Sequence, residues 1–88
     1  MTKIYIYCLF DSFDRFLGVY SSLKAVHRDA LRHCNKGTTP IYFLQGKEGP
    51  AQPSLTSIRN FFKGKCDVVA EYRSDRHGAK IFKTKLQE

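Results

Sequence analysis

The chain has 88 residues, which is room for one small domain with one core, so a multidomain enzyme is excluded. Hydrophobic residues make up 42% of it, with seven Phe and five Tyr, which is too much apolar surface for a disordered chain. Lys and Arg number 15 against eight Asp and Glu, and the net charge of +7 favours an anionic partner. We expect a single domain over residues 1–88 that acts through its surface.

The first segment predicts a β-hairpin. From Lys3 to Phe10, β-branched and aromatic residues alternate with a period of two, which indicates a strand. Turn-forming residues follow at Asp11, Ser12 and Asp14. Arg15–Tyr20 then predicts a second strand that pairs with the first.

The next segment predicts a helix. The hydroxyl groups of Ser21 and Ser22 can cap its N-terminus, and Asn35–Gly37 ends it. Apolar residues recur between these ends at three- and four-residue spacing, at Leu23, Val26, His27, Ala30, Leu31 and Cys34. We expect this stripe to face a sheet, with His27 at its margin as a packed imidazole that makes one hydrogen bond.

The second half predicts a strand, a loop, a helix and a terminal hairpin. Ile41–Leu44 is an apolar strand, and Gly46–Pro53 holds two of the six glycines and two of the three prolines, so we expect a mobile loop there. Ser54 caps a helix that runs to about Lys63 and stops at Gly64. Turn formers separate the last two strand-like runs, which are Cys66–Arg73 and Ala79–Leu86.

These elements predict an α+β fold. Their order along the chain is β-β-α-β-α-β-β, and hairpins at both ends favour a mostly antiparallel sheet with two helices packed on it.

The cysteines and the apolar runs indicate the compartment. Cys8, Cys34 and Cys66 are odd in number and far apart, which argues against a disulfide framework and against a structural zinc site. We expect all three to be reduced thiols, buried as small apolar groups. The chain has no signal-peptide pattern and no run of about eighteen apolar residues, so we expect a cytoplasmic protein without a membrane partner.

No motif in the chain indicates a reaction. There is no Gly-rich phosphate loop, no nucleophile elbow and no His pair at metal-binding spacing. We therefore expect a protein that is not an enzyme and that needs no cofactor and no metal ion. The enzymatic alternative is a small metal-independent ribonuclease, for which His77 in a flexible turn is a poor general base.

The charge pattern predicts two basic rows. Lys24, Arg28 and Arg32 lie four residues apart on the outer side of the first predicted helix, where an anionic partner would relieve their repulsion. The alternative for this row is a solvated helix face. The second row follows the terminal hairpin and consists of Arg73, Arg76, Lys80, Lys83 and Lys85. The alternative for the second row is that its Lys residues only protect an edge strand from pairing with other chains. These eight residues are the predicted nucleic-acid-binding site, and whether the two rows share one face stays open.

One segment resembles a known group of proteins. Phe16–Asn35, FLGVYSSLKAVHRDALRHCN, joins a strand ending in GVYSS directly to a capped helix. This stretch resembles the opening unit of small uncharacterised proteins that include accessory proteins of tailed bacteriophages. The resemblance implies an α+β module that binds host components in the host cytoplasm, and it transfers no site residue.

Three functions stay open at this point. The first is a nucleic-acid-binding accessory protein, for DNA or for RNA. The second is a modulator or inhibitor that binds an acidic host protein through exposed aromatic side chains with a basic rim, and the third is the ribonuclease. Phosphate binding needs only clustered cations, whereas sequence does not separate surface aromatics from core aromatics, so nucleic-acid binding is our prediction. The oligomeric state stays open.

Overall fold

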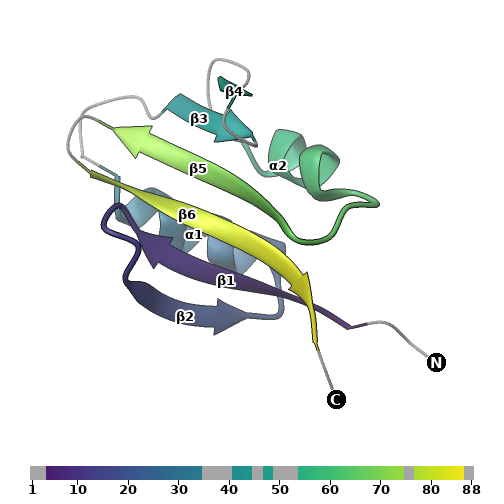
Figure 1. Ribbon diagram of the computed structural model, residues 1–88. Coiled ribbons are helices and arrows are strands. Elements are labelled where there is room, and N and C mark those ends of the chain that lie inside the picture. The colour runs from purple at the N-terminus through teal and green to yellow at the C-terminus, as the bar shows by residue number, and fades with distance from the viewer. Residues whose placement is uncertain (1–3, 35–40, 45–46, 49–53, 75–76, 87–88) are drawn as a thin grey trace.

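The structure is a computed structural model that describes residues 4–34, 41–44, 47–48, 54–74 and 77–86. Its strands form one antiparallel sheet in the order β2-β1-β6-β5-β3-β4 (Figure 1). The elements follow along the chain as β1 (Tyr5–Asp11), β2 (Phe16–Tyr20), α1 (Leu23–Arg32), β3 (Ile41–Leu44), β4 (Lys47–Glu48), α2 (Leu55–Phe62), β5 (Val68–Ser74) and β6 (His77–Lys85).

The predicted α+β class, with an antiparallel sheet and two helices, is confirmed. The predicted order of the elements is wrong, because Lys47–Glu48 pairs with β3 inside the segment predicted as a loop. Two residues are too few to show a period of two, and the neighbouring Gly and Pro residues favour a loop. Residues 46 and 49–53 lie outside the described part of the chain, so the mobility of Gly46–Pro53 stays a prediction.

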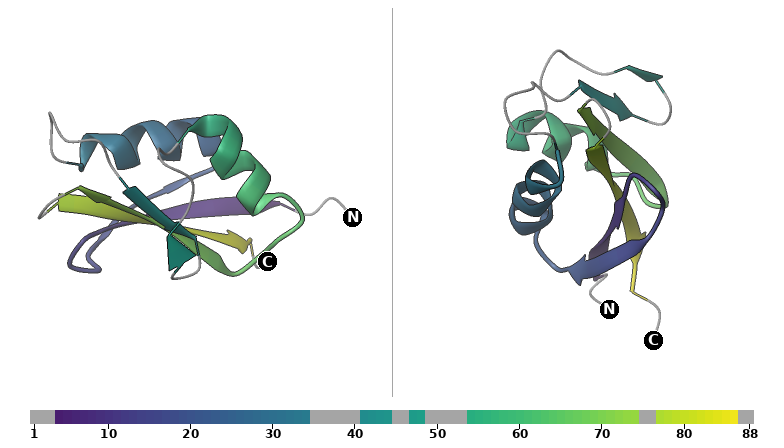
Figure 2. Two further views of the ribbon diagram at one scale, coloured as in Figure 1. Left: turned by 90° about the horizontal axis from the view of Figure 1, so that it is seen from above. Right: turned by 90° about the vertical axis from the view of Figure 1, so that its left-hand side faces the viewer.

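Both helices lie on the same face of the sheet (Figure 2). The Ser22 hydroxyl accepts a hydrogen bond from the Ala25 amide at 3.4 Å, which confirms the predicted cap of α1. Ser54 and Ser57 form a capping box at the start of α2. Gly64, with φ of +71°, follows the end of α2 in the left-handed conformation that glycine adopts without strain. Local hydrogen bonds thus define where α1 and α2 begin, and a glycine follows the end of α2.

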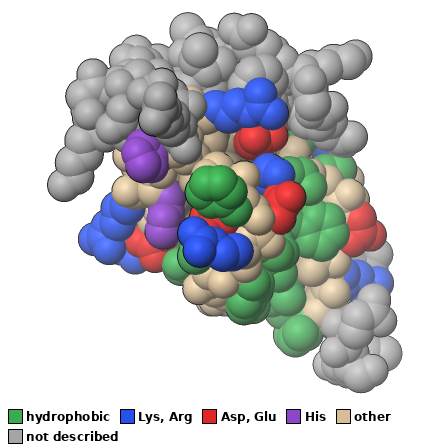
Figure 3. Space-filling model, turned by 60° about the vertical axis from the view of Figure 1, so that its left-hand side comes forward, with side chains coloured by type: hydrophobic (Ala, Val, Ile, Leu, Met, Phe, Trp, Pro, Cys, Tyr) green, Lys and Arg blue, Asp and Glu red, His purple; other side chains and the backbone are tan. Residues whose placement is uncertain are grey.

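Side chains of the strands alternate between the covered face and a face that no described helix covers. In β6, Ala79, Ile81 and Lys83 are buried on the helix side, whereas Lys80 and Phe82 point to the other side and are half-buried. We call this second side the open face. Figure 3 shows hydrophobic side chains on the molecular surface, with acidic and basic side chains among them.

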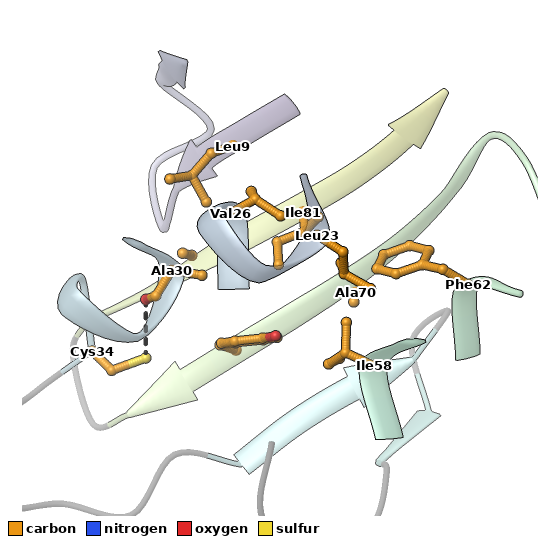
Figure 4. Packing of buried hydrophobic residues seen from close by; sticks show 11 residues of the cluster. Leu9, Leu23, Val26, Ala30, Cys34, Ile58, Phe62, Ala70 and Ile81 are labelled. Carbon is orange, nitrogen blue, oxygen red and sulfur yellow. Dashed lines mark hydrogen bonds between the residues drawn. The ribbon is translucent and has the colours of Figure 1, made fainter. Parts of the chain in front are cut away.

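The core lies between the helices and the central strands. Leu9, Ala70 and Ile81 from three strands meet the buried side chains of α1 and α2, which include Val26, Ala30, Ile58 and Phe62 (Figure 4). Tyr72 of β5 is fully buried in the same cluster. Burial of each such side chain contributes about 1.5–3 kcal/mol, so this single layer of contacts is the main source of stability.

The three cysteines differ in their exposure. Cys34 is buried, its Sγ donates to the Ala30 carbonyl oxygen at 3.6 Å, and burial raises the pKa of its thiol. Cys8 is half-buried, and Cys66 is exposed. The prediction of three buried thiols is therefore wrong for Cys66, which precedes the first paired residue of β5 and so lies outside the apolar alternation.

Gly78 permits the close approach of β5 and β6 at their hairpin. A Cβ at this position would overlap the backbone carbonyl oxygen of Tyr72, which cannot move aside. We expect Gly78→Ala to lower the free energy of unfolding by about 2 kcal/mol, measured by denaturant titration. Gly18→Ala is the matched control, because its Cβ would meet only the Tyr20 ring at 3.5 Å. Equal stability of the two variants would contradict this account of the hairpin.

Candidate functional site

The structure divides the predicted nucleic-acid-binding residues between two opposite surfaces. Lys24, Arg28 and Arg32 are exposed on α1, which packs on the covered face of the sheet. Arg73 and Lys80 lie on the open face, in β5 and β6. The two basic rows therefore do not share one face, and they cannot contact one stretch of backbone together.

Lys83 is not a surface cation. Its side chain is buried beneath α2, where Nζ donates to the Phe62 carbonyl oxygen at 2.7 Å and lies 4.6 Å from the centre of the Tyr5 ring. The ammonium group thus caps the C-terminal end of α2, where the helix dipole favours a cation. The prediction that Lys83 binds phosphate was therefore wrong. Alternation along β6 places Lys83 on the same side as Ile81, but the sequence does not reveal which side of the sheet the helices cover.

The remaining hairpin cations also differ from one another. Lys85 is exposed at the end of β6, and Arg76 lies outside the described residues. Arg73 Nε donates to Glu71 Oε2 at 2.7 Å, and Lys80 Nζ donates to Asp14 Oδ1 at 2.5 Å. Two cations are balanced here by two carboxylates, so this part of the open face offers little net positive charge to a phosphate.

The two helices, which we call the helix layer, carry an excess of positive charge. The sequences of α1 and α2 contain one acidic residue, Asp29, against four cations, Lys24, Arg28, Arg32 and Arg59. The layer therefore has a net charge of +3 from these residues, whereas the ion pairs of the open face cancel. The excess charge of the chain is thus unevenly distributed over the described surface.

Asp29 organises the row on α1. Arg28 Nε lies 3.3 Å and Arg32 Nη1 lies 3.6 Å from Asp29 Oδ1, and the Tyr20 hydroxyl donates to Oδ2 at 2.7 Å. The hydrogen bond from Tyr20, followed by the hydrogen bond from Arg28 and the positive charges of Arg28 and Arg32, lowers the pKa of Asp29. One carboxylate thus serves two guanidinium groups, and among the described residues Lys24 has no ion pair.

A groove of about 530 Å³ runs between the exposed side of α1 and the start of α2. Leu31 and Leu55 provide apolar surface in it, beside the cations. Its lining residues are Lys24, His27, Arg28, Leu31, Arg32 and Leu55. The groove therefore combines positive charges, which suit phosphates, with apolar contacts, which suit sugars or bases.

His27 borders the groove from the inside. Its Nδ1 lies 2.6 Å from the Tyr72 hydroxyl oxygen, and the two rings meet edge to face at 5.6 Å between centres. The prediction of a packed imidazole with a hydrogen bond is confirmed. Because burial lowers the pKa of His27, the ring is neutral at pH 7 and adds no charge to the groove.

Sequence reasoning missed two features of the surface. The first is the exposed apolar surface of the open face, where Phe10 and Phe82 line a second groove of about 500 Å³. The apolar character of both sides of the first predicted strand was the available signal.

The second is a small pocket of about 150 Å³ that brings His33 and His77 together with Arg15. No sequence signal links these histidines, since they lie 44 positions apart.

Comparison of the chain with models of protein families, with curated proteins and with solved structures finds no match. Neither helix in the described part of the chain has the length and apolar character needed to cross a membrane. Among the described residues, no three His, Cys, Asp or Glu side chains are arranged to hold a metal ion. The helix layer, with its groove and its unbalanced cations, is the candidate site.

The buried state of His27 predicts a pH dependence of stability. Its pKa is lower in the folded chain than the ordinary value of 6.5, so the unfolded chain binds the proton more tightly. The stabilising contribution of neutral His27 is present above about pH 6.5 and is lost as the pH falls toward the folded pKa. We expect His27→Gln to show a smaller loss of stability than the wild type between about pH 7 and pH 5. Denaturant titrations at both pH values measure this loss, with the exposed His33→Gln as control. An equal loss in wild type and His27→Gln would refute it.

Proposed function

We propose that the protein binds the sugar-phosphate backbone of a nucleic acid along the helix layer. Lys24, Arg28 and Arg32 contact phosphates, and Leu31 and Leu55 pack against the sugars or bases between them. The observation that supports this proposal most is the groove lined by three cations, of which Arg28 and Arg32 share one carboxylate. A phosphate near α1 would be attracted by an existing excess of positive charge, whereas on the open face it would compete with carboxylates for the cations.

The length of the row suits a nucleic acid. A helix rises about 1.5 Å per residue, so the eight steps from Lys24 to Arg32 span roughly 12 Å. This length is close to the width of the major groove of duplex DNA, about 12 Å, so the cations can reach phosphates on both of its sides. They can equally follow one strand of RNA or DNA. The contacts involve no base edge in particular, so we expect binding that is weak, steeply dependent on salt and little dependent on sequence.

The salt dependence of binding tests this function. Three phosphate contacts predict a slope of roughly −2.7 in a plot of log K against log salt on duplex DNA. We expect Arg28→Ala with Arg32→Ala to flatten this slope by about two, because two counterion-releasing contacts are lost. Fluorescence anisotropy with a labelled oligonucleotide measures the slope. Both side chains are mostly exposed, at 63% and 73%, so the fold tolerates their removal.

The matched control is Arg73→Ala with Lys80→Ala, which removes the same charge from the open face. This double variant is expected to leave the slope unchanged. Equal flattening by both double variants would show that binding follows net charge alone and would refute the assignment to the helix layer. Absence of binding at about 50 mM salt and micromolar protein, on duplex and on single strands, would refute nucleic-acid binding.

A second candidate function is metal-independent cleavage of RNA, favoured by the pocket that contains His33, His77 and Arg15. One neutral imidazole would take the proton of a ribose 2′-hydroxyl, whose oxygen attacks the adjacent phosphorus. The P–O5′ bond breaks, and the second imidazole, as imidazolium, gives its proton to the departing oxygen. The products are a 2′,3′-cyclic phosphate and a free 5′-hydroxyl, and Arg15 would stabilise the pentacoordinate phosphorane.

This candidate predicts cleavage of RNA but not of DNA, because only RNA has the attacking 2′-hydroxyl. We expect His33→Ala and His77→Ala each to reduce cleavage about a hundredfold, with His27→Gln as the control that retains activity. Gel electrophoresis of a labelled RNA in the presence of a chelator measures the rate. Intact RNA after long incubation, or cleavage that persists in both variants, would eliminate the candidate and leave binding alone.

A further inference from the structure

The strand β2 ends the sheet, so one of its two edges has no partner strand. It pairs with β1 on one side, and among the described residues no strand pairs with its other side (Figure 1). The sequence of β2, FLGVY, contains no charged residue and no proline. Charged residues and proline are common means by which sheet edges avoid pairing with other chains. The outer edge of β2 is therefore open to pairing with an extended chain.

The pairing with β1 shows which backbone groups point outward. The Asp11 amide donates to the Arg15 carbonyl oxygen at 3.0 Å, so Asp11 directs its backbone groups toward β2. Backbone groups alternate in direction along a strand, so Leu9 also points toward β2, and its partner Gly18 points back toward β1. Val19 follows Gly18 and therefore directs its N–H and C=O away from the sheet.

Apolar side chains line this edge on the open face. Val19 lies opposite Cys8 in the register, and Cys8 lies opposite Phe82. Phe16 lies opposite Phe10, on the same side of the sheet. Val19 is 55% exposed and Phe16 is 59% exposed. A chain beside β2 would cover both with its own side chains, so this side of the edge suits apolar residues.

Cations lie on the other side of the same edge. Tyr20 faces the helices, and its hydroxyl donates to Asp29 Oδ2 at 2.7 Å. Arg28 Nε lies 3.3 Å and Arg32 Nη1 lies 3.6 Å from the other oxygen of this carboxylate. Both guanidinium groups are mostly exposed, and one carboxylate serves the two of them. The helix side of the edge thus has surplus positive charge, which suits acidic side chains.

We propose that β2 binds an extended segment of a partner protein in which apolar and acidic residues alternate. The segment adds to the sheet as a new edge strand, antiparallel to β2, and exchanges backbone hydrogen bonds with Val19. Successive side chains of a strand point to opposite faces. The apolar residues of the segment therefore pack beside Val19 and Phe16, and its acidic residues reach toward Arg28 and Arg32. The free backbone groups require an extended chain, and the charge of the edge selects its sequence pattern.

The same charge disfavours a second copy of the chain at this edge. Two β2 strands that pair antiparallel about a two-fold axis would place their α1 helices side by side, on one side of a continuous sheet. Each α1 carries Lys24, Arg28 and Arg32 against one carboxylate, that of Asp29, so the two helices would repel each other. An acidic segment is attracted where a second copy is repelled.

Synthetic peptides test the occupant. The probe is a fluorescein-labelled peptide of about seven residues with blocked ends, in which Glu and Val alternate. The control peptide alternates Lys and Val, so it has the same apolar side chains. We expect the Glu peptide to bind at least about tenfold more tightly than the Lys peptide at about 50 mM salt, measured by fluorescence anisotropy. Equal affinities, or no binding of the Glu peptide at about 1 mM, would overturn the proposal.

Methylated peptides separate strand pairing from attraction between charges. In antiparallel pairing, the residue opposite Val19 shares its face and directs its own N–H toward Val19, so this N–H belongs to a Val of the peptide. N-methylation of the Val residues is expected to lower the affinity about tenfold or more. N-methylation of the Glu residues, whose N–H groups point away from β2, is expected to change it less than about twofold. The same affinity for both methylated peptides would overturn the pairing.

A variant of Val19 locates the peptide on the protein. Val19→Pro removes the outward N–H, and we expect it to lower the affinity for the Glu peptide about tenfold. An acidic segment and a nucleic acid would compete for Arg28 and Arg32, but only the segment needs the backbone of Val19. Val19→Pro is therefore expected to leave oligonucleotide binding unchanged, so this proposal and the proposed function fail independently. Unchanged peptide affinity in a variant that folds by circular dichroism would refute the site.

A charge reversal tests the helix side of the edge without changing β2. Arg28→Glu with Arg32→Glu alters two exposed side chains and is expected to reverse the preference, so that the Lys peptide binds more tightly than the Glu peptide. A double variant that still prefers the Glu peptide would overturn the assignment of the acidic residues. Sedimentation of the wild type as a dimer that Val19→Pro abolishes would show that the edge takes a second copy instead.

Discussion

The packing of α1 and α2 on the same side of the sheet determines which side chains this protein presents on its surface. The helices have ten and eight residues, enough to cover the central strands on one side only. The covered side takes Leu9, Tyr72 and Ile81 out of water and forms the core. The same alternation that buries them turns Cys8 and Phe82 to the open face. In this small chain, two short helices therefore bury one side of the sheet and leave the other side uncovered by any described helix.

The distribution of charge follows from the same arrangement. The helices that cover the sheet carry four cations and one carboxylate, whereas the ion pairs of the open face cancel. Lys83 shows why counting cations along the sequence misleads, since its ammonium group is buried against the end of α2. The net charge of +7 attracts anions, and this attraction is stronger at the helix layer than at the strands.

Much of the fold is predictable from local patterns. The period of three to four residues that defines α1, its Ser22 cap, the hairpins and the packed position of His27 all depend on neighbours in sequence or on simple amphipathicity. The position of β4 was not predictable, because two residues carry no periodicity. The side of the sheet that the helices cover was not predictable either, since β1 and β6 carry apolar residues on both faces. The side that the helices cover determines that Lys83 is buried and that the two basic rows lie on different faces.

The candidate site was predictable only in part for a related reason. The row of Lys24, Arg28 and Arg32 is a local helical pattern, and the structure places it on one groove. The partners of the hairpin cations come from elsewhere in the chain, as with Asp14, which lies 66 positions from Lys80. Contacts at such separation leave no trace in spacing or composition.

The central claim is that a nucleic acid binds at the helix layer and not at the open face. Amide chemical-shift mapping by NMR tests it most directly, with a titration of an oligonucleotide into the protein at low salt. The account predicts that the oligonucleotide shifts the amides of Leu23–Arg32 and leaves those of β5 and β6 unchanged. Shifts confined to β5 and β6 would contradict it.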